Sequence, residues 1–281
     1  MESKFIGICK DLNEYGQGIV YYDNNMIVVD NLLVNEEAEI IITKKTYKYY
    51  LGRVYKYIKT SKDRNVVHCN SKCGGCDLIH LNYPLQIEYK AKQFNELFAG
   101  YNILNFIHAD NNYHYRNKVQ AAFGRTKSGK IISGVYQSGS HRIVSVDSCM
   151  TEDKIADEII VDIRNMLPKF KIWTYDEDRG TGFLRHVLVK RGFTSGEVMV
   201  VLVGASGFFP MKKKFTTELL RKHPEITTVV LNVNDKFTSL VLGKQEKVLF
   251  GKGYIEDICC GCRFRISAKS FLHSGMPSST P

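Results

Sequence analysis

The sequence lacks the long apolar segments of a membrane protein. No run approaches the roughly 20 apolar residues that a transmembrane helix needs. The N-terminal stretch MESKFIGICKDLNEYG carries acidic residues and has no apolar core of a signal peptide. The sequence also contains no glycine-rich loop placed after a strand and followed, about 20 residues later, by an acid, as a dinucleotide-binding fold would have. We therefore expect a cytoplasmic protein without membrane contact, in which thiols stay reduced and clustered cysteines point to a metal site.

Acidic residues are scarce in two stretches of a chain that is basic overall. The 281 residues carry a net charge of +10, and the pI is about 9.1. Residues 41–64 contain eight basic side chains and one acid, whereas residues 111–146 contain six basic side chains and no acid. In KKTYKYY, the bases Lys44, Lys45 and Lys48 are interleaved with tyrosines. This combination is typical of nucleic-acid binding, which should weaken as the salt concentration rises.

The pattern of apolar residues predicts an α+β protein. Short strands separated by turn residues fill residues 1–60 and favour a small OB-like β-barrel. Helices are expected at 82–100 and 151–167, where Thr151 is a suitable N-cap. Residues 101–266 combine helices with hairpins, which favours an antiparallel α+β domain, and the tail 267–281 is expected not to pack.

Three of the eight cysteines lie within eight positions, in HCNSKCGGCDLIHL. Cys69, Cys73 and Cys76 have spacings that suit ligands around one centre, and the two glycines before Cys76 permit a tight loop. Cys149, directly before the second predicted helix, is the candidate fourth ligand. Thiolates suit either zinc or an iron–sulfur cluster, and ligand type alone does not decide between them. The remaining four are expected to be structural: Cys9, Cys259, Cys260 and Cys262.

The segment CGGCDLIHLNYPLQIEYK resembles the cluster loop and following helix of the RNA uracil-5-methyltransferase family, in its 23S ribosomal-RNA branch. Similar segments follow in the family's order: YRNKVQ at 115–120, SGVYQSGSHRIVSVDSC at 133–149, GFLRHVLVKRG at 182–192 and GCRFRISAKSF at 261–271. The resemblance implies an RNA-binding TRAM barrel over 1–60, a [4Fe-4S] loop and helix over 61–100, and a central domain over 101–266. It also implies Cys73, Cys76 and Cys149 as cluster ligands, whereas Cys69 departs from the usual spacing.

The resemblance also implies a reaction. In the family, a cysteine thiolate adds to C6 of uracil, C5 takes the methyl group of S-adenosylmethionine, and a carboxylate removes the C5 proton. Those groups lie in a C-terminal Rossmann-like domain, and the text after RISAKSF, namely SFLHSGMPSSTP, no longer matches. We therefore expect a truncated member in which that domain and its catalytic residues are absent. Such a chain would be a monomer that binds 23S ribosomal RNA without turnover.

The matched segments also suggest RNA contacts at Arg116, Lys118, Arg185 and His186, in addition to the three barrel lysines. For Arg185 and His186 the alternative is pairing with the acids at 176–178 to brace a turn. Two other classes of protein stay open: a non-enzymatic RNA-binding protein with a cluster or zinc, and a radical S-adenosylmethionine enzyme. Against the latter, Gly75 stands where an aromatic residue is usual, and no series of βα units follows.

Overall fold

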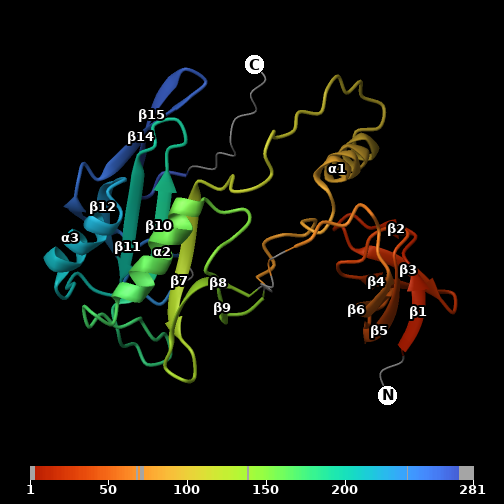
Figure 1. The fold of residues 1–281 in the computed structure, drawn as a ribbon, viewed down its shortest axis with the longest axis horizontal. Helices are drawn as coiled ribbons and strands as arrows, with labels where there is room; N and C mark the ends of the chain where they lie inside the picture. Colours follow the sequence, from red (N-terminus) through yellow and green to blue (C-terminus); the bar gives the residue numbers. More distant parts are fainter. Residues whose placement is uncertain (1–3, 68, 70–72, 138, 239, 272–281) are drawn as a thin grey trace. The chain divides into compact units, whose positions relative to one another are not determined.

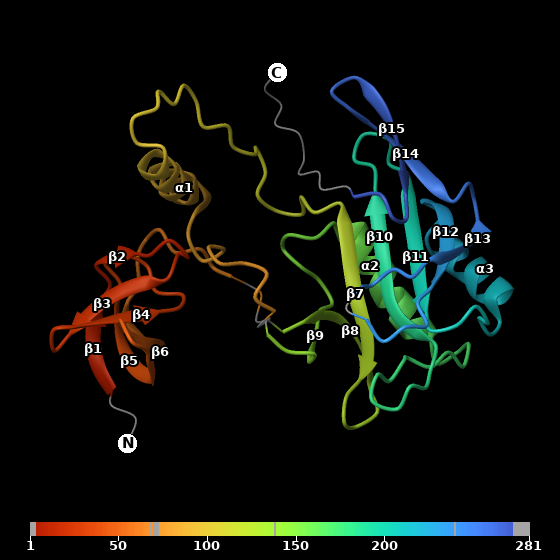
Figure 2. The same ribbon diagram turned by 180° about the vertical axis from the view of Figure 1, so that it is seen from behind.

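The computed structural model describes residues 4–67, 69, 73–137, 139–238 and 240–271. The chain divides into two compact units (Figures 1 and 2). Unit 1 comprises Met1–Asn70 and Gly74–His108, and unit 2 comprises Ser71–Cys73 and Ala109–Pro281. Among the described residues, no helix is both long and apolar enough to cross a bilayer.

The described strands of unit 1 form a closed barrel. Its strands are β1 (Lys4–Ile8), β2 (Asp11–Leu12), β3 (Gly18–Tyr22), β4 (Asn25–Val29), β5 (Glu37–Lys45) and β6 (Tyr50–Lys59). The order is β1-β5-β6-β4-β3-β2, with β4 parallel to β6. Because β1 runs almost directly into β2, one stretch of chain pairs with β5 at its start and with β3 at its end. This pairing closes the sheet and gives the strand order of an OB-like barrel.

Alternating side chains fill the barrel. Phe5, Val20, Ile27 and Ile40 point inward and are almost completely buried. Cys9 lies with them and is fully buried, and this burial raises the pKa of its thiol to about 11. Cys9 is therefore a wall residue of the barrel rather than a reactive thiol.

The helix α1 (Tyr83–Leu97) follows the cysteine loop in unit 1. The Asn82 side chain caps it by accepting a hydrogen bond from the backbone N–H of Leu85, and Pro84 occupies the first turn, where its missing N–H costs nothing. The Tyr89 hydroxyl donates a hydrogen bond to the carbonyl of Asn13, the residue that directly follows β2 in the barrel. Through this contact, α1 is attached to the barrel although none of its own residues is fully buried.

Unit 2 is built on a mixed sheet of the order β13-β12-β11-β10-β7-β8-β9. The strands are β7 (Lys118–Arg125), β8 (Ile131–Tyr136), β9 (Ile143–Ser145), β10 (Leu184–Arg191), β11 (Val198–Gly204), β12 (Ile226–Val233) and β13 (Gln245–Phe250). The sequence predicted an antiparallel domain, but the sheet is mixed, because β11 and β12 are parallel. The helix α3 (Lys212–Lys222) makes the crossover that a parallel pair requires.

Both faces of this sheet are covered where β10, β11 and β12 lie. The helices α2 (Lys154–Met166) and α3 cover one face, and the hairpin of β14 (Tyr254–Cys259) and β15 (Cys262–Ser267) covers the other. In β11, Val200 and Leu202 therefore face the helices, while Val201 and Val203 face the hairpin. This explains why β11 is apolar throughout and does not alternate.

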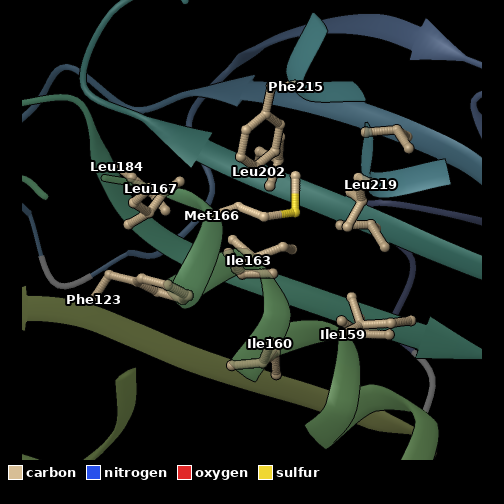
Figure 3. Close-up of a cluster of buried hydrophobic side chains, with 14 of the residues drawn as sticks. Phe123, Ile159, Ile160, Ile163, Met166, Leu167, Leu184, Leu202, Phe215 and Leu219 are labelled. Atoms are coloured by element: carbon tan, nitrogen blue, oxygen red, sulfur yellow. The ribbon is translucent and has the colours of Figure 1, made fainter. Parts of the chain in front are cut away.

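The helix α2 contributes five of the buried residues of the core on its side of the sheet. Ile159, Ile163 and Met166 are buried between α2, the sheet and Phe215 of α3 (Figure 3). The N-cap of α2 is Asp153 and not the predicted Thr151: its carboxylate accepts a hydrogen bond from the N–H of Ala156 at 3.1 Å. The same carboxylate binds Arg191 at 2.7 Å, which ties the start of α2 to the end of β10.

Candidate functional site

The three predicted barrel lysines surround the turn between β5 and β6. Lys44 and Lys45 end β5, Lys48 lies in the turn, and all three side chains are exposed. The turn is fixed by Thr46, whose hydroxyl donates to the carbonyl of Tyr49 at 2.5 Å and accepts from the Tyr49 N–H at 3.1 Å. Tyr47 projects from this turn and is 100% exposed. The barrel thus presents three cations and one aromatic ring on a short, ordered hairpin, which we call the lysine hairpin.

The barrel also carries a cation beside an aromatic ring, and no sequence pattern predicted this pair. The ammonium of Lys4 on β1 sits 3.5 Å from the ring centroid of Tyr55 on β6, and that tyrosine is 54% exposed. The strand β5 lies between these two strands in the sheet. The pair joins residues about 50 positions apart, so no local pattern could reveal it.

A short strand-like pairing within unit 1 closes the base of the loop that carries the three clustered cysteines. Asn65 donates from its backbone N–H to the carbonyl of His80 and from its side chain to that of Leu81, both at 2.9 Å. Asn82 donates to the carbonyl of Asp63, also at 2.9 Å. The loop that carries Cys69, Cys73 and Cys76 therefore begins and ends at one fixed point.

A buried ion pair fixes this point to the barrel. The carboxylate of Glu36, which is 0% exposed, accepts two hydrogen bonds of 2.6 Å from Arg64. It also accepts the backbone N–H of Leu33 at 2.9 Å and of Ser61 at 3.0 Å. Burial raises the pKa of Glu36, but these four donors outweigh it and the net shift is downward. Arg64, one of the eight bases in residues 41–64, is therefore committed to structure.

Cys149 lies in unit 2, in the segment between β9 and α2. Its backbone N–H donates to Asp157 of α2 at 2.7 Å, and its sulfur lies 3.3 Å from the hydroxyl of Thr151. Burial raises the pKa of the neighbouring Glu152 to about 7, and the Asp157 carboxylate adds to this shift. The position of Cys149 is thus set by the start of α2.

The described residues do not form a metal site. Among them, no group of three or more histidine, cysteine, aspartate or glutamate side chains has the geometry to hold a metal ion. The predicted ligands Cys69, Cys73, Cys76 and Cys149 are all described, and each carries a thiol rather than a disulfide. The described residues therefore present no assembled centre.

Three of the other four cysteines differ from expectation. Cys259, Cys260 and Cys262 were expected to be structural, but they are exposed at the tip of the β14–β15 hairpin. Cys260 has φ of +50° and Gly261 has φ of +76°, so the two residues form the turn itself. They belong to a surface turn and not to a core.

Of the predicted RNA contacts in unit 2, Arg116 and Lys118 are partly exposed at the start of β7. Arg116 is held by backbone bonds to Thr151 and Asp153 at the beginning of α2. Lys118 pairs across the sheet with Lys190, whose side chain is buried. Burial and the nearby Lys118 lower the pKa of Lys190 to about 8.

Lys190 is a buried cation with a structural role that sequence reasoning did not predict. Its ammonium donates to the carbonyls of Ser267, Ala268 and Ser270, at distances of 2.7 to 2.9 Å. These carbonyls belong to the turn that follows β15. A lysine in a strand gives no signal in the sequence that it caps a turn almost 80 residues further along the chain.

Arg185 and His186 do not present charge at the surface. The guanidinium of Arg185 donates to the carbonyls of Asn234 and Lys236 and pairs with Glu177 at 2.6 Å. Its side chain is 4% exposed. Burial, followed by the charge of Arg185, lowers the pKa of His186 to about 4, so His186 is neutral at pH 7. The geometry of Arg185 fits the alternative interpretation, in which this residue pairs with an acid at 176–178 and braces a turn; its acidic partner is Glu177.

Comparisons with known proteins relate the chain to RNA methyltransferases. No family model matches it. A protein of Oceanobacillus iheyensis named as an uncharacterized RNA methyltransferase is 35% identical over 270 residues, which cover 94% of this chain and 59% of the relative. A protein of Clostridium acetobutylicum with the same description is 34% identical over 93% of this chain and 59% of the relative.

A solved structure shares the fold. The Pyrococcus abyssi tRNA (uracil-54, C5)-methyltransferase, in complex with S-adenosyl-L-homocysteine, matches with a TM-score of 0.73 and 24% identity. The match covers 96% of this chain and 61% of that structure. The chain thus spans about three fifths of the proteins to which it is similar.

The prediction that the methyltransferase domain is absent is wrong. Similarity to proteins named RNA methyltransferases covers 94% of this chain, and the fold of a solved methyltransferase covers 96% of it. The described fold is therefore one that methyltransferases share. We expected this absence because the sequence stops matching the family shortly before its last residue. The position at which a given sequence ends does not show which domains the protein has. The expectation of RNA binding without turnover, with no catalytic residue, depended on that absence and loses its support.

Proposed function

We propose that this chain is part of an RNA methyltransferase that modifies C5 of uracil, and that its described residues bind the RNA. The observation that carries the proposal is the similarity, over 94% of the chain, to proteins named RNA methyltransferases. The shared fold with a tRNA uracil-C5 methyltransferase supports the choice of uracil C5. The basic charge of the chain supports the choice of a polyanionic substrate.

The lysine hairpin is the proposed RNA contact of unit 1, which would then serve as a TRAM-like domain. Lys44, Lys45 and Lys48 are exposed, and no ion pair of theirs appears in the described part of the chain. Each ammonium that reaches a phosphate releases counterions, whereas the exposed ring of Tyr47 offers a surface on which an unpaired base can stack. In unit 2 we propose Arg116 and Lys118 as contacts, and we no longer include Arg185 and His186.

S-adenosylmethionine is the proposed methyl donor, because the solved neighbour holds S-adenosyl-L-homocysteine, the product that remains after methyl transfer. The donor would supply the methyl group for C5 of the uracil. We assign no described residue of this chain to it. The contribution proposed for these residues is to bind and orient the RNA.

Cys69, Cys73, Cys76 and Cys149 remain proposed ligands of a [4Fe-4S] cluster or of zinc, supported by their spacing and by their reduced state. Iron, sulfide and zinc analysis of anaerobically purified protein tests this proposal. If the protein binds a cluster or zinc, Cys149→Ser should reduce the amount of iron and sulfide, or of zinc, per protein. A protein that contains none of the three elements would refute the ligand set.

The proposed function is tested by RNA binding and methyl transfer together. The protein is titrated with labelled 23S ribosomal RNA and with transfer RNA at several salt concentrations, and then incubated with methyl-labelled S-adenosylmethionine. Methylation at C5 of uridine by the full protein is the expected result, and the more strongly bound RNA identifies the substrate class. If neither RNA binds, the proposal is refuted. Binding without methyl transfer would favour the non-enzymatic alternative.

A matched pair of variants isolates the lysine hairpin. Lys44→Gln/Lys45→Gln/Lys48→Gln removes three charges from the hairpin, and Lys212→Gln/Lys213→Gln/Lys214→Gln removes three from α3. Both variants change the net charge equally. Only the hairpin variant should flatten the dependence of log K on log salt, by about 2, since each phosphate contact with a single strand contributes about 0.7. Equal effects of the two variants would mean that only total charge matters.

A further inference from the structure

Unit 2 contains a groove at one end of the sheet that none of the predicted sites includes. Its volume is about 1100 Å³. Three segments form most of its lining: the end of β7 with the following turn, residues 141–143 at the start of β9, and residues 171–183 before β10. Ile132 and Pro210 complete it. The first two segments belong to the acid-free stretch 111–146.

The most prominent side chain of the groove is Trp173, the single tryptophan of the chain. It is 62% exposed, although its neighbours Ile172 and Thr174 are buried. Its carbonyl accepts hydrogen bonds from the N–H groups of Phe183 and Leu184, at 2.9 and 3.0 Å. The backbone beneath the indole is therefore held against the start of β10, and the ring is a fixed, solvent-facing platform.

Glycine at position 182 is required for this arrangement. Gly182 has φ of +103°, and a Cβ atom there would lie 2.2 Å from the carbonyl oxygen of Thr174. The close approach brings residues 174 and 182 together and sets the path of the segment that carries Trp173. The platform is thus built by the fold and is not a side chain on a loose loop.

The groove pairs this ring with positive charge. The guanidinium of Arg125 lies 4.3 Å from the ring centroid of Trp173. Other basic side chains of the lining are Lys127, Arg142, Lys171 and Arg179. The lining contains three acids. Glu177 is paired with the buried Arg185 at 2.6 Å, Asp176 accepts the backbone N–H groups of residues 178 and 179 and pairs with Arg179 at 3.8 Å, and Asp178 is exposed. The surface that remains is predominantly cationic.

We infer that this groove binds an unpaired segment of RNA, with one base stacked on Trp173 and Arg125 and the adjoining phosphates on Lys127, Arg142 and Lys171. The inference rests on the proposed function and extends it to a second RNA site. An exposed ring beside cations is the arrangement that binds single strands, because every base has a face that can stack. A paired base inside a duplex cannot offer its face to the ring.

The single tryptophan makes the test direct, because intrinsic tryptophan fluorescence reports on this groove alone. A short oligouridylate is titrated into the 281-residue chain while tryptophan emission is recorded, and the same titration is followed by anisotropy of a labelled oligouridylate. We expect quenching of Trp173 that saturates at the concentrations at which the oligonucleotide binds. A duplex of the same length should quench little.

Variants separate stacking from folding. Trp173→Leu should weaken oligouridylate binding roughly 5- to 150-fold, the range for loss of one stacked base. Trp173→Phe keeps a ring and should retain most of the affinity, whereas Phe237→Leu, which removes an exposed ring outside the groove, should have no effect. Arg142→Gln should lower the salt dependence by about 0.7, one phosphate contact. Thermal melting checks that each variant is folded.

The outcomes distinguish this inference from the proposed function. If RNA binds but tryptophan emission and the affinity of Trp173→Leu are unchanged, the groove is not an RNA site, although the protein still binds RNA elsewhere. If duplex or uridine monophosphate binds as tightly as the oligouridylate, the assignment to an unpaired polymer segment is overturned. If no RNA binds at all, both proposals fail.

Discussion

Replacing Arg64 with alanine is expected to destabilise unit 1 strongly, because it leaves a carboxylate buried without its counter-charge. Glu36 is 0% exposed, and two of the four hydrogen bonds that its carboxylate accepts come from Arg64. The variant also removes the bond from Arg64 to the carbonyl of Asn31 and the contact of its guanidinium with the ring of Tyr57. Only the backbone N–H groups of Leu33 and Ser61 then remain as partners of Glu36.

Removal of one member of a buried ion pair costs about 3 to 5 kcal/mol. The two remaining backbone donors place the expected loss for Arg64→Ala near the lower end, at about 3 kcal/mol. Such a loss is a large part of the roughly 5 to 15 kcal/mol that stabilises a typical domain. Because Arg64 also begins the pairing at the base of the cysteine loop, the loop should lose its fixed ends in the same variant.

The loss is measured by urea unfolding followed by circular dichroism. Trp173 lies in unit 2, so its fluorescence serves as an internal control whose midpoint should stay unchanged. Lys62→Ala, which removes an exposed charge two residues away, should be nearly neutral. Replacing both Glu36 and Arg64 with methionine removes the charges together and should cost less than Arg64→Ala alone. A loss below about 1 kcal/mol for Arg64→Ala, the range of a surface ion pair, would refute this reasoning.

Three further outcomes are expected. Ile163→Ala should cost about 2 to 5 kcal/mol by opening a cavity between α2 and the sheet, and the tryptophan midpoint in urea should fall accordingly (Figure 3). His186 has a lowered pKa, so its contribution to stability is complete above its ordinary pKa of 6.5 and is lost as the pH falls toward 4. The full shift corresponds to about 3 kcal/mol of unfolding free energy. His186→Gln should therefore reduce the pH dependence of the unfolding of unit 2. Glu36 has a lowered pKa as well, so its stabilising effect is complete above pH 4.5 and declines in more acidic solution, a decline that the double methionine variant should not show.

The functional proposals depend on two different kinds of surface. The lysine hairpin is exposed and local, and its sequence KKTYKYY already shows both the charges and the rings. The groove of unit 2 is assembled mainly from three segments between residues 124 and 183: the ring of Trp173 lies on one of them, whereas Arg125 and Arg142 lie on the other two. Loss of either surface should weaken RNA binding, but only the groove reports through Trp173.

The sequence determined the elements whose signals are local. Three features depend only on neighbours a few residues apart and can therefore be read from the sequence: the apolar period of α2, the turn residues between the barrel strands and the charges of the lysine hairpin. The tertiary structure decided which bases are available for binding. Arg64 and Arg185 have the same chemistry as Arg125 and Arg142, yet the first two are committed to partners 28 and 49 residues away. Such pairing joins residues far apart in the sequence and forms where burial removes competing water. The parallel strand pair and the platform at Trp173 also depend on contacts between distant residues, so they could be recognised only in the fold.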